Sequence, residues 1–360
     1  MNPFLEEVKV ARQAVQAAVK IAQHVLFDSN KGAIQKADLT PVTVADYTIQ
    51  AVLAHAIHTH FPSDQLVGEE SAGELNTNPN LVQHMWTVLQ ACDQRDDVDK
   101  IPDPSHLPKL ISLCETTTSF GIDSGRVWIF DPIDGTKTFL RGEQYAINVA
   151  LLVGGRQVLS VVACPLLCPS ETEPIDNATI SEVGCILLAV KGYGAWVQPL
   201  SGPHSGNLAR LPRHADGDSV MTQDLKLVTC WNMLDSGVDD VHKAVAENLG
   251  APFPGSDLVS WVCRWAVMAL GVANITVWVY KTRSRHAKIW DHAGAMLLFE
   301  EVGGMITDVD GKDIDLTRGR KLSANFGFVA APRSIHHRVL KAVRDTLRAQ
   351  GKGELLSSTP

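Results

Sequence analysis

The chain has 360 residues and a mass of 39.1 kDa, which is enough for two domains or for one large α/β unit. Hydrophobic residues make up 45% of it and charged residues 20%, a balance that excludes collagen-like, low-complexity and wholly disordered chains. The formal charge is −8 and no block of lysine or arginine stands out, so the pattern also excludes proteins that coat nucleic acids or membrane surfaces.

The sequence indicates a cytoplasmic protein with reduced thiols. Charged residues interrupt the apolar pattern of the first 27 residues, unlike a signal peptide, and no apolar run approaches the roughly 18–20 residues of a membrane span. The number of cysteines is odd, and the pair at 164 and 168 has no second pair at zinc-site spacing. We therefore expect free, mostly buried thiols at positions 92, 114, 164, 168, 185, 230 and 263.

In the first half, apolar periodicity predicts long helices followed by short strands. Apolar residues recur at helical spacing over 4–27. Thr43, with Asp46 three positions later, has the pattern of a capping box and opens a second helix. Further along we expect a helix over 81–89, a mobile polar surface insertion over 93–108, and strands over 65–68, 127–130, 146–153 and 158–164.

The second half alternates strands and helices, which favours a layered α/β architecture. Its patterns predict a hairpin over 184–190 and 194–197, a loop over 201–223, strands over 226–231 and 275–280, and helices over 238–249, 260–270, 290–302 and 334–350. Gly271 is placed to end the helix that starts at 260. We expect the residues from 351 onward to form a flexible tail.

The most informative segment is an apolar strand that runs directly into Asp131-Pro-Ile-Asp134-Gly135. Proline withholds an N–H and glycine permits a tight bend, so this turn can aim both carboxylates and the Ile133 carbonyl into one small volume. Two carboxylates so close repel each other unless a cation lies between them. Oxygen ligands of this kind suit Mg²⁺, and the amides of residues 135–137 can receive a phosphate oxygen.

Other acidic residues strengthen the case for a metal site, although each position also has a simpler explanation. Taken alone, the Asp131–Gly135 segment is typical of a surface turn. Asp46 and Asp291 lie at expected helix starts, where a carboxylate also stabilises the helix dipole. Glu69 and Glu70 directly follow an expected strand. It is the combination of these positions that favours a metal site over turns and caps.

These motifs, in this order, resemble the inositol monophosphatase superfamily of Mg²⁺-dependent, lithium-sensitive phosphatases over about residues 4–345. The segments that carry the resemblance are Asp131-Pro-Ile-Asp-Gly-Thr136, Trp290-Asp-His-Ala293, Thr40-Pro-Val-Thr-x-x-Asp46 and Gly68-Glu-Glu70. The segment Lys137-x-Phe-Leu-Arg-Gly-x-Gln-Tyr-Ala146 is similar to the fungal-type 3′(2′),5′-bisphosphate nucleotidases, which remove the 3′-phosphate of adenosine 3′,5′-bisphosphate.

The resemblance implies an α/β fold, the layered α-β-α-β-α sandwich of the inositol monophosphatase type. Residues 1–166 would form a metal- and phosphate-binding half, residues 167–350 a substrate-capping half, and residues 351–360 the flexible tail. The resemblance also implies two or three Mg²⁺ ions, with Lys36 and Asp38 tuning the third, weaker site.

The same resemblance assigns the metal ligands. Glu69, Asp131 and the Ile133 carbonyl would hold one Mg²⁺. Asp131, Asp134 and Asp291 would hold a second, and the two ions would bridge oxygens of the phosphate.

It also assigns the residues around the attacking water and the substrate. A water activated by the metals would lie between Asp46, which serves as the base, and Thr136. Gly135, Thr136 and Asp291 would bind the substrate. Glu70 would not bind metal directly but would orient Thr136 or a water.

The second half departs from the nucleotidase pattern where that family binds its substrate. The His-Ser pair of the family is missing from residues 229–236, and its Ser-x-x-Lys becomes Trp261-x-x-Arg264. Trp278 falls where the family carries a phosphate-binding arginine. Arg264 is a candidate to bind a second phosphate, and Lys281, Arg283 or Arg285 are candidates to compensate for the missing arginine. Trp261, Trp265 and Trp278 either line an enlarged aromatic pocket or pack in the core.

We therefore predict a Mg²⁺-dependent phosphate monoester hydrolase, inhibited by Li⁺, with adenosine 3′,5′-bisphosphate and its sulfated relative as leading substrates. Two alternatives stay open: an inositol-phosphate or specialised-metabolite phosphatase of the same fold, and a non-catalytic nucleotide sensor. Retention of the metal and water residues argues against the sensor. The expected partner is a small phosphorylated metabolite rather than a nucleic acid or a membrane, and the protein would be a monomer or a homodimer.

Overall fold

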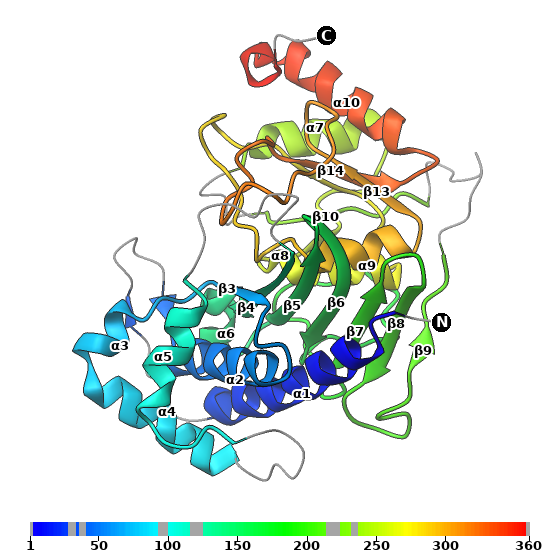
Figure 1. Ribbon diagram of the computed structural model, residues 1–360. Coiled ribbons are helices and arrows are strands. Elements are labelled where there is room, and N and C mark those ends of the chain that lie inside the picture. Colours follow the sequence, from blue (N-terminus) through cyan, green and yellow to red (C-terminus); the bar gives the residue numbers. More distant parts are fainter. Residues whose placement is uncertain are drawn as a thin grey trace.

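A computed structural model arranges the chain in alternating layers of helices and sheets (Figure 1). The described residues are 3–27, 34–35, 41–92, 100–115, 125–213, 224–231 and 237–357. In Figure 1 the layers follow one another from the blue helices at the bottom of the view to the red helix at the top. The predicted α-β-α-β-α sandwich is confirmed.

The helices occupy three of the five layers. They are α1 Leu5–Phe27, α2 Val44–His60, α3 Gly73–Thr77, α4 Pro79–Cys92, α5 His106–Leu113, α6 Thr136–Arg141, α7 Asp239–Leu249, α8 Trp261–Leu270, α9 Ala295–Glu301, α10 His336–Ala349 and a 3₁₀ turn, η2, Gly353–Leu355. Helices α1 and α2 cover one face of the large sheet, and α8 and α9 lie between the two sheets. Helices α7 and α10 pack together on the outer side of the small sheet.

The strands form a large and a small sheet and two short pairs. They are β1 Ile34–Gln35, β2 Pro41–Val42, β3 Gln65–Gly68, β4 Arg126–Asp134, β5 Ala146–Val153, β6 Arg156–Cys164, β7 Cys185–Val190, β8 Gly194–Pro199, β9 Ala209–Arg210, β10 Val228–Thr229, β11 Ser256–Asp257, β12 Thr276–Trp278, β13 Gly304–Thr307 and β14 Phe328–Pro332. The large sheet has the order β3-β4-β5-β6-β7-β8-β9, and only β3 and β4 run parallel in it. The small sheet has the order β12-β14-β13.

Strand β4 shows how one sheet serves two hydrophobic cores. Val127 and Ile129 belong to the core shared with α8, α9 and the small sheet, whereas Trp128 and Phe130 belong to the core under α1 and α2. Because successive side chains of a strand point to opposite faces, the next residue, Asp131, faces the layer of α8 and α9. The alternation of β4 therefore sends a carboxylate into the space between the large sheet and that helical layer.

Most predicted elements are confirmed, some with small shifts at their ends. The strands at 65–68 and 146–153 have the predicted bounds. The hairpin appears as β7 and β8, which pair antiparallel. Thr43 and Asp46 form the predicted capping box at the start of α2. Each of these elements has a sequence signal that lies within the element itself.

Two predicted elements are wrong over part of their length. The strand expected over 226–231 is reduced to the two residues of β10, which pair with β11. The helix expected over 290–302 begins only at Ala295, because Gly294 has a φ of +84°, outside the helical region. The four residues before Ala295 form turns instead.

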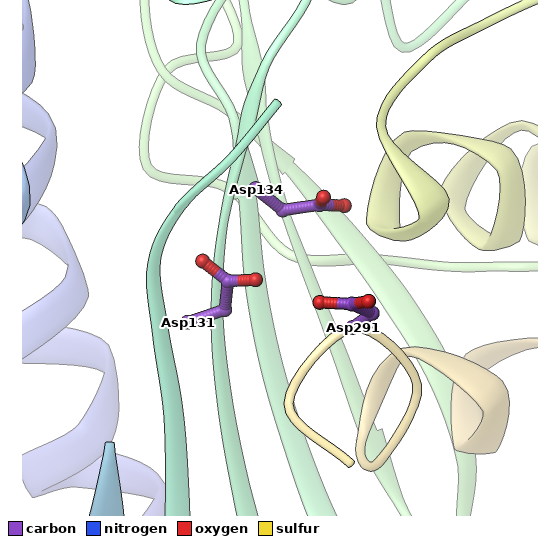
Figure 2. Close-up of side chains that lie close together, drawn as sticks. All are labelled: Asp131, Asp134 and Asp291. Atoms are coloured by element: carbon purple, nitrogen blue, oxygen red, sulfur yellow. The ribbon is translucent and has the colours of Figure 1, made fainter. Parts of the chain in front are cut away.

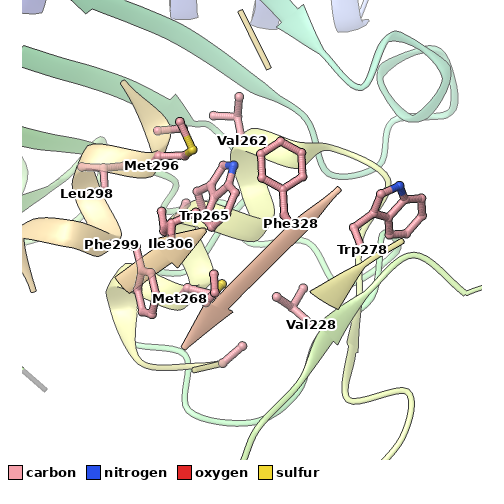
Figure 3. Packing of buried hydrophobic residues seen from close by; sticks show 14 of the residues in the cluster. Val228, Val262, Trp265, Met268, Trp278, Met296, Leu298, Phe299, Ile306 and Phe328 are labelled. Carbon is pink, nitrogen blue, oxygen red and sulfur yellow. The ribbon is translucent and has the colours of Figure 1, made fainter. Parts of the chain in front are cut away.

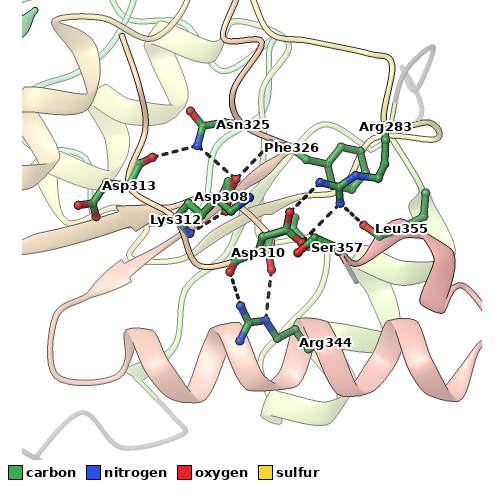
Figure 4. Close-up of polar contacts among 11 residues, drawn as sticks. Arg283, Asp308, Asp310, Lys312, Asp313, Asn325, Phe326, Arg344, Leu355 and Ser357 are labelled. Atoms are coloured by element: carbon green, nitrogen blue, oxygen red, sulfur yellow. Dashed lines mark hydrogen bonds and ion pairs between the residues drawn. The ribbon is translucent and has the colours of Figure 1, made fainter. Parts of the chain in front are cut away.

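Residues 351–357, predicted to be part of a flexible tail, are instead held against the second half of the chain (Figure 4). Arg283 donates to the Leu355 carbonyl at 2.7 Å and forms a salt bridge of 2.7 Å with Asp310. The backbone N–H of Ser357 donates to the same aspartate at 2.9 Å, and the Leu355 side chain is buried. Residues 358–360 lie outside the described residues.

Other predictions concern the organisation of the whole chain. The large sheet continues past residue 166 into β7, β8 and β9, and the division into two halves at that point stays a prediction. Of the expected insertion at 93–108, residues 93–99 lie outside the described residues, and α5 begins within the remainder. In the described stretches, every helix is too short or too polar to span a membrane. All seven cysteines are free, and five of them are buried, as predicted.

Candidate active site

Three aspartates from distant parts of the chain meet between the large sheet and the layer of α8 and α9. Side-chain oxygens of Asp131, Asp134 and Asp291 lie within 4.8 Å of one another. Figure 2 shows the three carboxylates turned toward a common centre, two from the end of β4 and one from the turn before α9. Asp131 is only 1% exposed and Asp134 9%, so bulk water screens their charges poorly.

A β-bulge explains why Asp131 and Asp134 reach the same side of the sheet. Residues three apart in a regular strand point to opposite faces. In β4, however, Asp131 pairs with Asn148 and Asp134 with Ala146, so that three residue steps on β4 oppose only two on β5. The extra residue of this bulge turns Asp134 back to the side of Asp131.

Asn148 brings the turn that carries Asp291 close to the end of β4. Its side-chain amide donates to the carbonyls of Trp290 at 2.6 Å and Ala293 at 2.8 Å. Because Asn148 pairs with Asp131 in the sheet, these bonds hold the turn directly beside that carboxylate. Asn148 was not among the residues predicted for the site. A lone asparagine inside the apolar strand 146–153 was the available signal, since a buried amide needs hydrogen-bond partners.

The three carboxylates are electrostatically strained without a cation. Burial, followed by the charges of Glu69 and of the other aspartates, raises the pKa of Asp131 well above its usual value. Burial and the neighbouring carboxylates have the same effect on the pKa of Asp291, and burial raises the pKa of Asp134 to about 6. A divalent cation would favour the charged form of each group. The Oδ1 atom of Asp131 is buried without a hydrogen-bond partner among the described residues, so this oxygen is available as a ligand.

The start of helix α8 holds Asp134. Its Oδ2 atom accepts hydrogen bonds from the Ser260 hydroxyl at 2.6 Å and from the Val262 backbone N–H at 2.5 Å. Ser260 is also the N-cap of α8, and its hydroxyl accepts the Cys263 N–H at 2.9 Å. These bonds favour the charged carboxylate and oppose the effect of burial on the Asp134 pKa. The N-cap residue of α8 therefore both caps the helix and holds Asp134 in the acidic cluster.

The capping box of α2 orients Asp46 toward Thr136. The Oδ2 atom of Asp46 accepts the N–H of Thr43 at 2.7 Å and its hydroxyl at 2.6 Å. The Thr136 hydroxyl lies 3.4 Å from Oδ1 of Asp46 and 3.2 Å from the Ile133 carbonyl, and both oxygens are placed to accept its proton. The explanation of Asp46 as a helix cap and its role as a candidate base are thus compatible, because each uses a different oxygen.

A cavity of about 150 Å³ lies next to the three aspartates and Thr136. The described residues that line it are Glu69, Asp131, Ile133, Asp134, Gly135, Thr136, Lys137, Val259 and Asp291. Seven of these nine were predicted as metal-binding, catalytic or substrate-binding residues, the Lys137 amide was expected to receive a phosphate oxygen, and Val259 is additional. Glu70 lies behind this wall with 2% exposure, and its backbone exchanges two hydrogen bonds with the Gln50 amide. Its predicted role toward Thr136 stays a prediction.

The structure contradicts the predicted contact of Arg264 with the substrate. Arg264 is 2% exposed and is not among the described residues that line the cavity. Its guanidinium donates to the carbonyls of Leu258 at 2.7 Å and Val259 at 3.1 Å. The same group lies over the rings of Trp261 and Trp278, with 4.0 Å and 4.8 Å from Cζ to the ring centres. Arg264 therefore holds the segment before α8 rather than a phosphate.

The three tryptophans of the second half pack against one another instead of lining a pocket. Trp265 and Trp278 are 0% and 3% exposed, and Figure 3 shows both among the side chains of the core. The Trp261 ring lies 6.0 Å from that of Trp265 and 5.4 Å from that of Trp278, centre to centre. Of the two interpretations of these residues, core packing is the one that the structure favours.

Several predicted positions lie outside the described residues. They are Lys36 and Asp38, expected near a third metal ion, Thr40 of the first motif, and residues 232–236 of the stretch where the family His-Ser pair is missing. Nothing in the structure bears on them.

The layered fold and the acidic cluster match a family of metal-dependent phosphatases. The inositol monophosphatase family matches residues 5–348, and the chain belongs to this family. Among curated relatives, a 3′(2′),5′-bisphosphate nucleotidase of Emericella nidulans is 33% identical over 366 residues, covering 96% of this chain and 99% of the relative. A 3′(2′),5′-bisphosphate nucleotidase of Schizosaccharomyces pombe is 32% identical, covering 94% and 95%.

Solved structures support the same fold. Inositol monophosphatase II of Staphylococcus aureus superposes with a TM-score of 0.60 at 17% identity, covering 98% of this chain and 99% of that one. A structure described as 2′AMP-bound SaIMPase-II gives a TM-score of 0.58 at 17% identity, covering 97% and 98%. At this level of identity the likeness concerns the fold alone.

Proposed function

We propose that this protein removes the 3′-phosphate of adenosine 3′,5′-bisphosphate in a Mg²⁺-dependent reaction, with the sulfated relative of that nucleotide as a further substrate. The observation that carries the proposal is the buried cluster of Asp131, Asp134 and Asp291, in which one Asp131 oxygen has no hydrogen-bond partner among the described residues. The adjoining pair of Asp46 and Thr136 supplies the groups that a hydrolytic reaction needs. The choice of substrate rests on the relatives, which are named as bisphosphate nucleotidases.

The acidic groups around the cavity would hold the metal. Glu69, Asp131 and the Ile133 carbonyl form one set of oxygen ligands, and the three aspartates form a second set that shares Asp131. When bound, two Mg²⁺ ions neutralise charge on the phosphoryl group and make a water more acidic. Because Asp134 has one oxygen committed to Ser260 and Val262, its other oxygen is the one left for a cation.

Asp46 and Thr136 then act on the attacking water. The Oδ2 atom of Asp46 already accepts two hydrogen bonds from Thr43, so Oδ1 is the oxygen that can accept a further proton. The Thr136 hydroxyl accepts a proton from the water while it gives its own proton to this Oδ1 atom. The proton thus moves from the water to the buried carboxylate as the new bond to phosphorus forms. The bond from phosphorus to the 3′ oxygen breaks in the same step, and this oxygen leaves as the ribose hydroxyl with a proton taken from solvent water.

One observation favours a second candidate, a phosphatase for an ester with a single phosphate such as an inositol phosphate. The guanidinium of Arg264, one candidate for a second phosphate, is buried, donates to two backbone carbonyls and lies over two aromatic rings, and only its Nη1 atom has no hydrogen-bond partner among the described residues. Both candidates share the metal chemistry and differ only in the leaving group. Inhibition by Li⁺ and a cytoplasmic location belong to either proposal.

The test is phosphate release by the purified protein with Mg²⁺ from adenosine 3′,5′-bisphosphate, adenosine 2′,5′-bisphosphate, inositol 1-phosphate and AMP. Rapid release from the two bisphosphates alone supports the nucleotidase. Release mainly from inositol 1-phosphate supports the second candidate and overturns the first. The matched control is Asp46→Asn, which keeps the shape of the side chain but removes its ability to accept the proton. Equal activity of this variant and the unmodified protein would overturn the hydrolytic mechanism.

A further inference from the structure

One arginine outside the acidic cluster connects two of the segments that line the cavity. The Nη2 atom of Arg320 donates to the backbone carbonyl of Gly68 at 2.8 Å and to that of Glu69 at 3.1 Å. The same guanidinium lies over the Trp290 ring, with 4.6 Å from Cζ to the ring centre. Glu69 and Asp291, the residue after Trp290, both line the cavity.

The backbone of Arg320 is fixed to the Asp291 side. Its carbonyl accepts the N–H of Ile289 at 3.1 Å, and Lys288 and Lys321 form an antiparallel bridge next to it. The main chain of Arg320 therefore moves together with the turn that carries Asp291. Its side chain extends from this base to the end of β3, a segment that comes from the other half of the sequence.

Arg320 adds to the bonds at the end of β3, where the Gly68 N–H donates to the Cys114 carbonyl at 3.1 Å and the Gln50 amide binds the backbone of Glu70. Strand β3 ends at Gly68, so Glu69 lies beyond the last ladder pair. The charge of Glu69 raises the pKa of both Asp131 and Asp291, which means that Glu69 is repelled by the cluster it must join to bind a metal. A planar guanidinium can donate to two carbonyls and stack on an indole at the same time, which a lysine cannot do with the same geometry.

We propose that Arg320 is a positioning residue that sets the separation between Glu69 and Asp291 and thereby the affinity of the site for its metal ions. This inference rests on the proposed metal site. Arg320 is not among the described residues that line the cavity, and it acts through the backbone of Glu69 and the ring of Trp290. Its loss should therefore weaken metal binding more than it changes the rate of the chemical step.

The direct test is Mn²⁺ binding to the full-length protein without substrate, followed by electron paramagnetic resonance. Arg320→Lys keeps the charge but loses the planar fork and the stacking, and we expect a dissociation constant raised by about tenfold. At saturating Mg²⁺ the kcat of the variant should stay within about threefold of the unmodified protein. The matched control is Arg344→Lys, because Arg344 also donates to backbone carbonyls, those of Val309 and Asp310 (Figure 4), and lies on α10, on the outer side of the small sheet.

Each result of these measurements either supports or overturns the role of Arg320. Mn²⁺ binding by Arg320→Lys equal to that of the unmodified protein overturns the proposal, and so does an equal weakening in Arg344→Lys, which would indicate general loss of stability. Should Arg320→Lys fail to fold, Trp290→Phe keeps the arginine and narrows the stacking surface. A smaller weakening in that variant supports the proposal, and unchanged binding overturns it. If the unmodified protein binds no Mn²⁺, both this proposal and the metal site of the proposed function are overturned.

Discussion

Replacing Thr43 with alanine tests whether a helix cap also orients the candidate base. The Thr43 side chain is 1% exposed, and its hydroxyl donates to Asp46 at 2.6 Å and accepts the Ala45 N–H at 3.1 Å. Loss of the helix cap costs about 1 kcal/mol. Loss of a buried hydrogen bond to a carboxylate costs about 1.5 kcal/mol. This is the lower end of the range for such bonds, because the Thr43 N–H still binds the same oxygen. We expect the free energy of unfolding to fall by about 2.5 kcal/mol.

The same substitution should also affect catalysis. Without the Thr43 hydroxyl on Oδ2, the Asp46 carboxylate can rotate away from Thr136, and we expect kcat to fall about tenfold, which corresponds to about 1.4 kcal/mol in the barrier. Thr43→Ser is the matched control, because it keeps the hydroxyl and removes one methyl group. Urea unfolding and phosphate release at saturating Mg²⁺ give the two quantities. If alanine lowers stability but leaves kcat equal to that of the serine variant, Thr43 is a cap only and the orientation argument is refuted.

Three further predictions follow from single residues. Asp134→Ala removes a carboxylate of the cavity and should abolish Mg²⁺-dependent phosphate release in a malachite-green assay; a clearly active variant would contradict the site. Gly294 has a φ of +84°, and a Cβ there would lie 2.7 Å from that of Ala150, so Gly294→Ala should lower the free energy of unfolding in urea by about 3 kcal/mol. Gly192→Ala, with a φ of +78° and open space, should cost only about 1 kcal/mol, and equal losses would show that overlap is not the cause. Burial lowers the pKa of His242 to about 3, whereas the unfolded value is about 6.5, so the stability that the neutral ring contributes is complete above pH 6.5. As the pH falls from 6.5 to 5, protons bind only the unfolded state, and the free energy of unfolding should decrease by about 2 kcal/mol. His242→Gln should remove this part of the pH dependence in urea unfolding, and an unchanged slope would contradict it.

The elements and residues that could be predicted share one property, which is that their signals are local. The capping box of Thr43 and Asp46 needs residues three apart, and the strand at 146–153 needs only an apolar run. The strand predicted over 127–130 correctly led into Asp131, but the structure extends β4 to Asp134, so this carboxylate lies within the strand rather than just past its end. The family resemblance then added Glu69 and Asp291 to the predicted metal site. The local pattern alone could not distinguish a metal ligand at these positions from an ordinary acidic residue at a strand end or a helix start.

The residues that were missed or misassigned depend on contacts between distant segments. Asn148 looks like an ordinary strand residue until the turn at Trp290 lies beside it. Arg264 looked available for a phosphate because the sequence does not show that the carbonyls of Leu258 and Val259 already accept its hydrogen bonds. In each case the deciding partner is a backbone group, and backbone groups are the same in every sequence.

The sequence by itself determined the longer helices, several strands of the large sheet, the acidic segment that became the last residues of β4, and the cap of α2, because each depends on spacing within a few residues. Only the tertiary structure decided which carboxylates share a cavity and what holds them there. The bulge in β4 turns Asp134 to the side of Asp131, Ser260 binds it from α8, and Arg320 joins the end of β3 to the turn of Asp291. These contacts arise only when the layers pack, since the free energy that offsets the repulsion between buried carboxylates comes from the whole core rather than from any one segment.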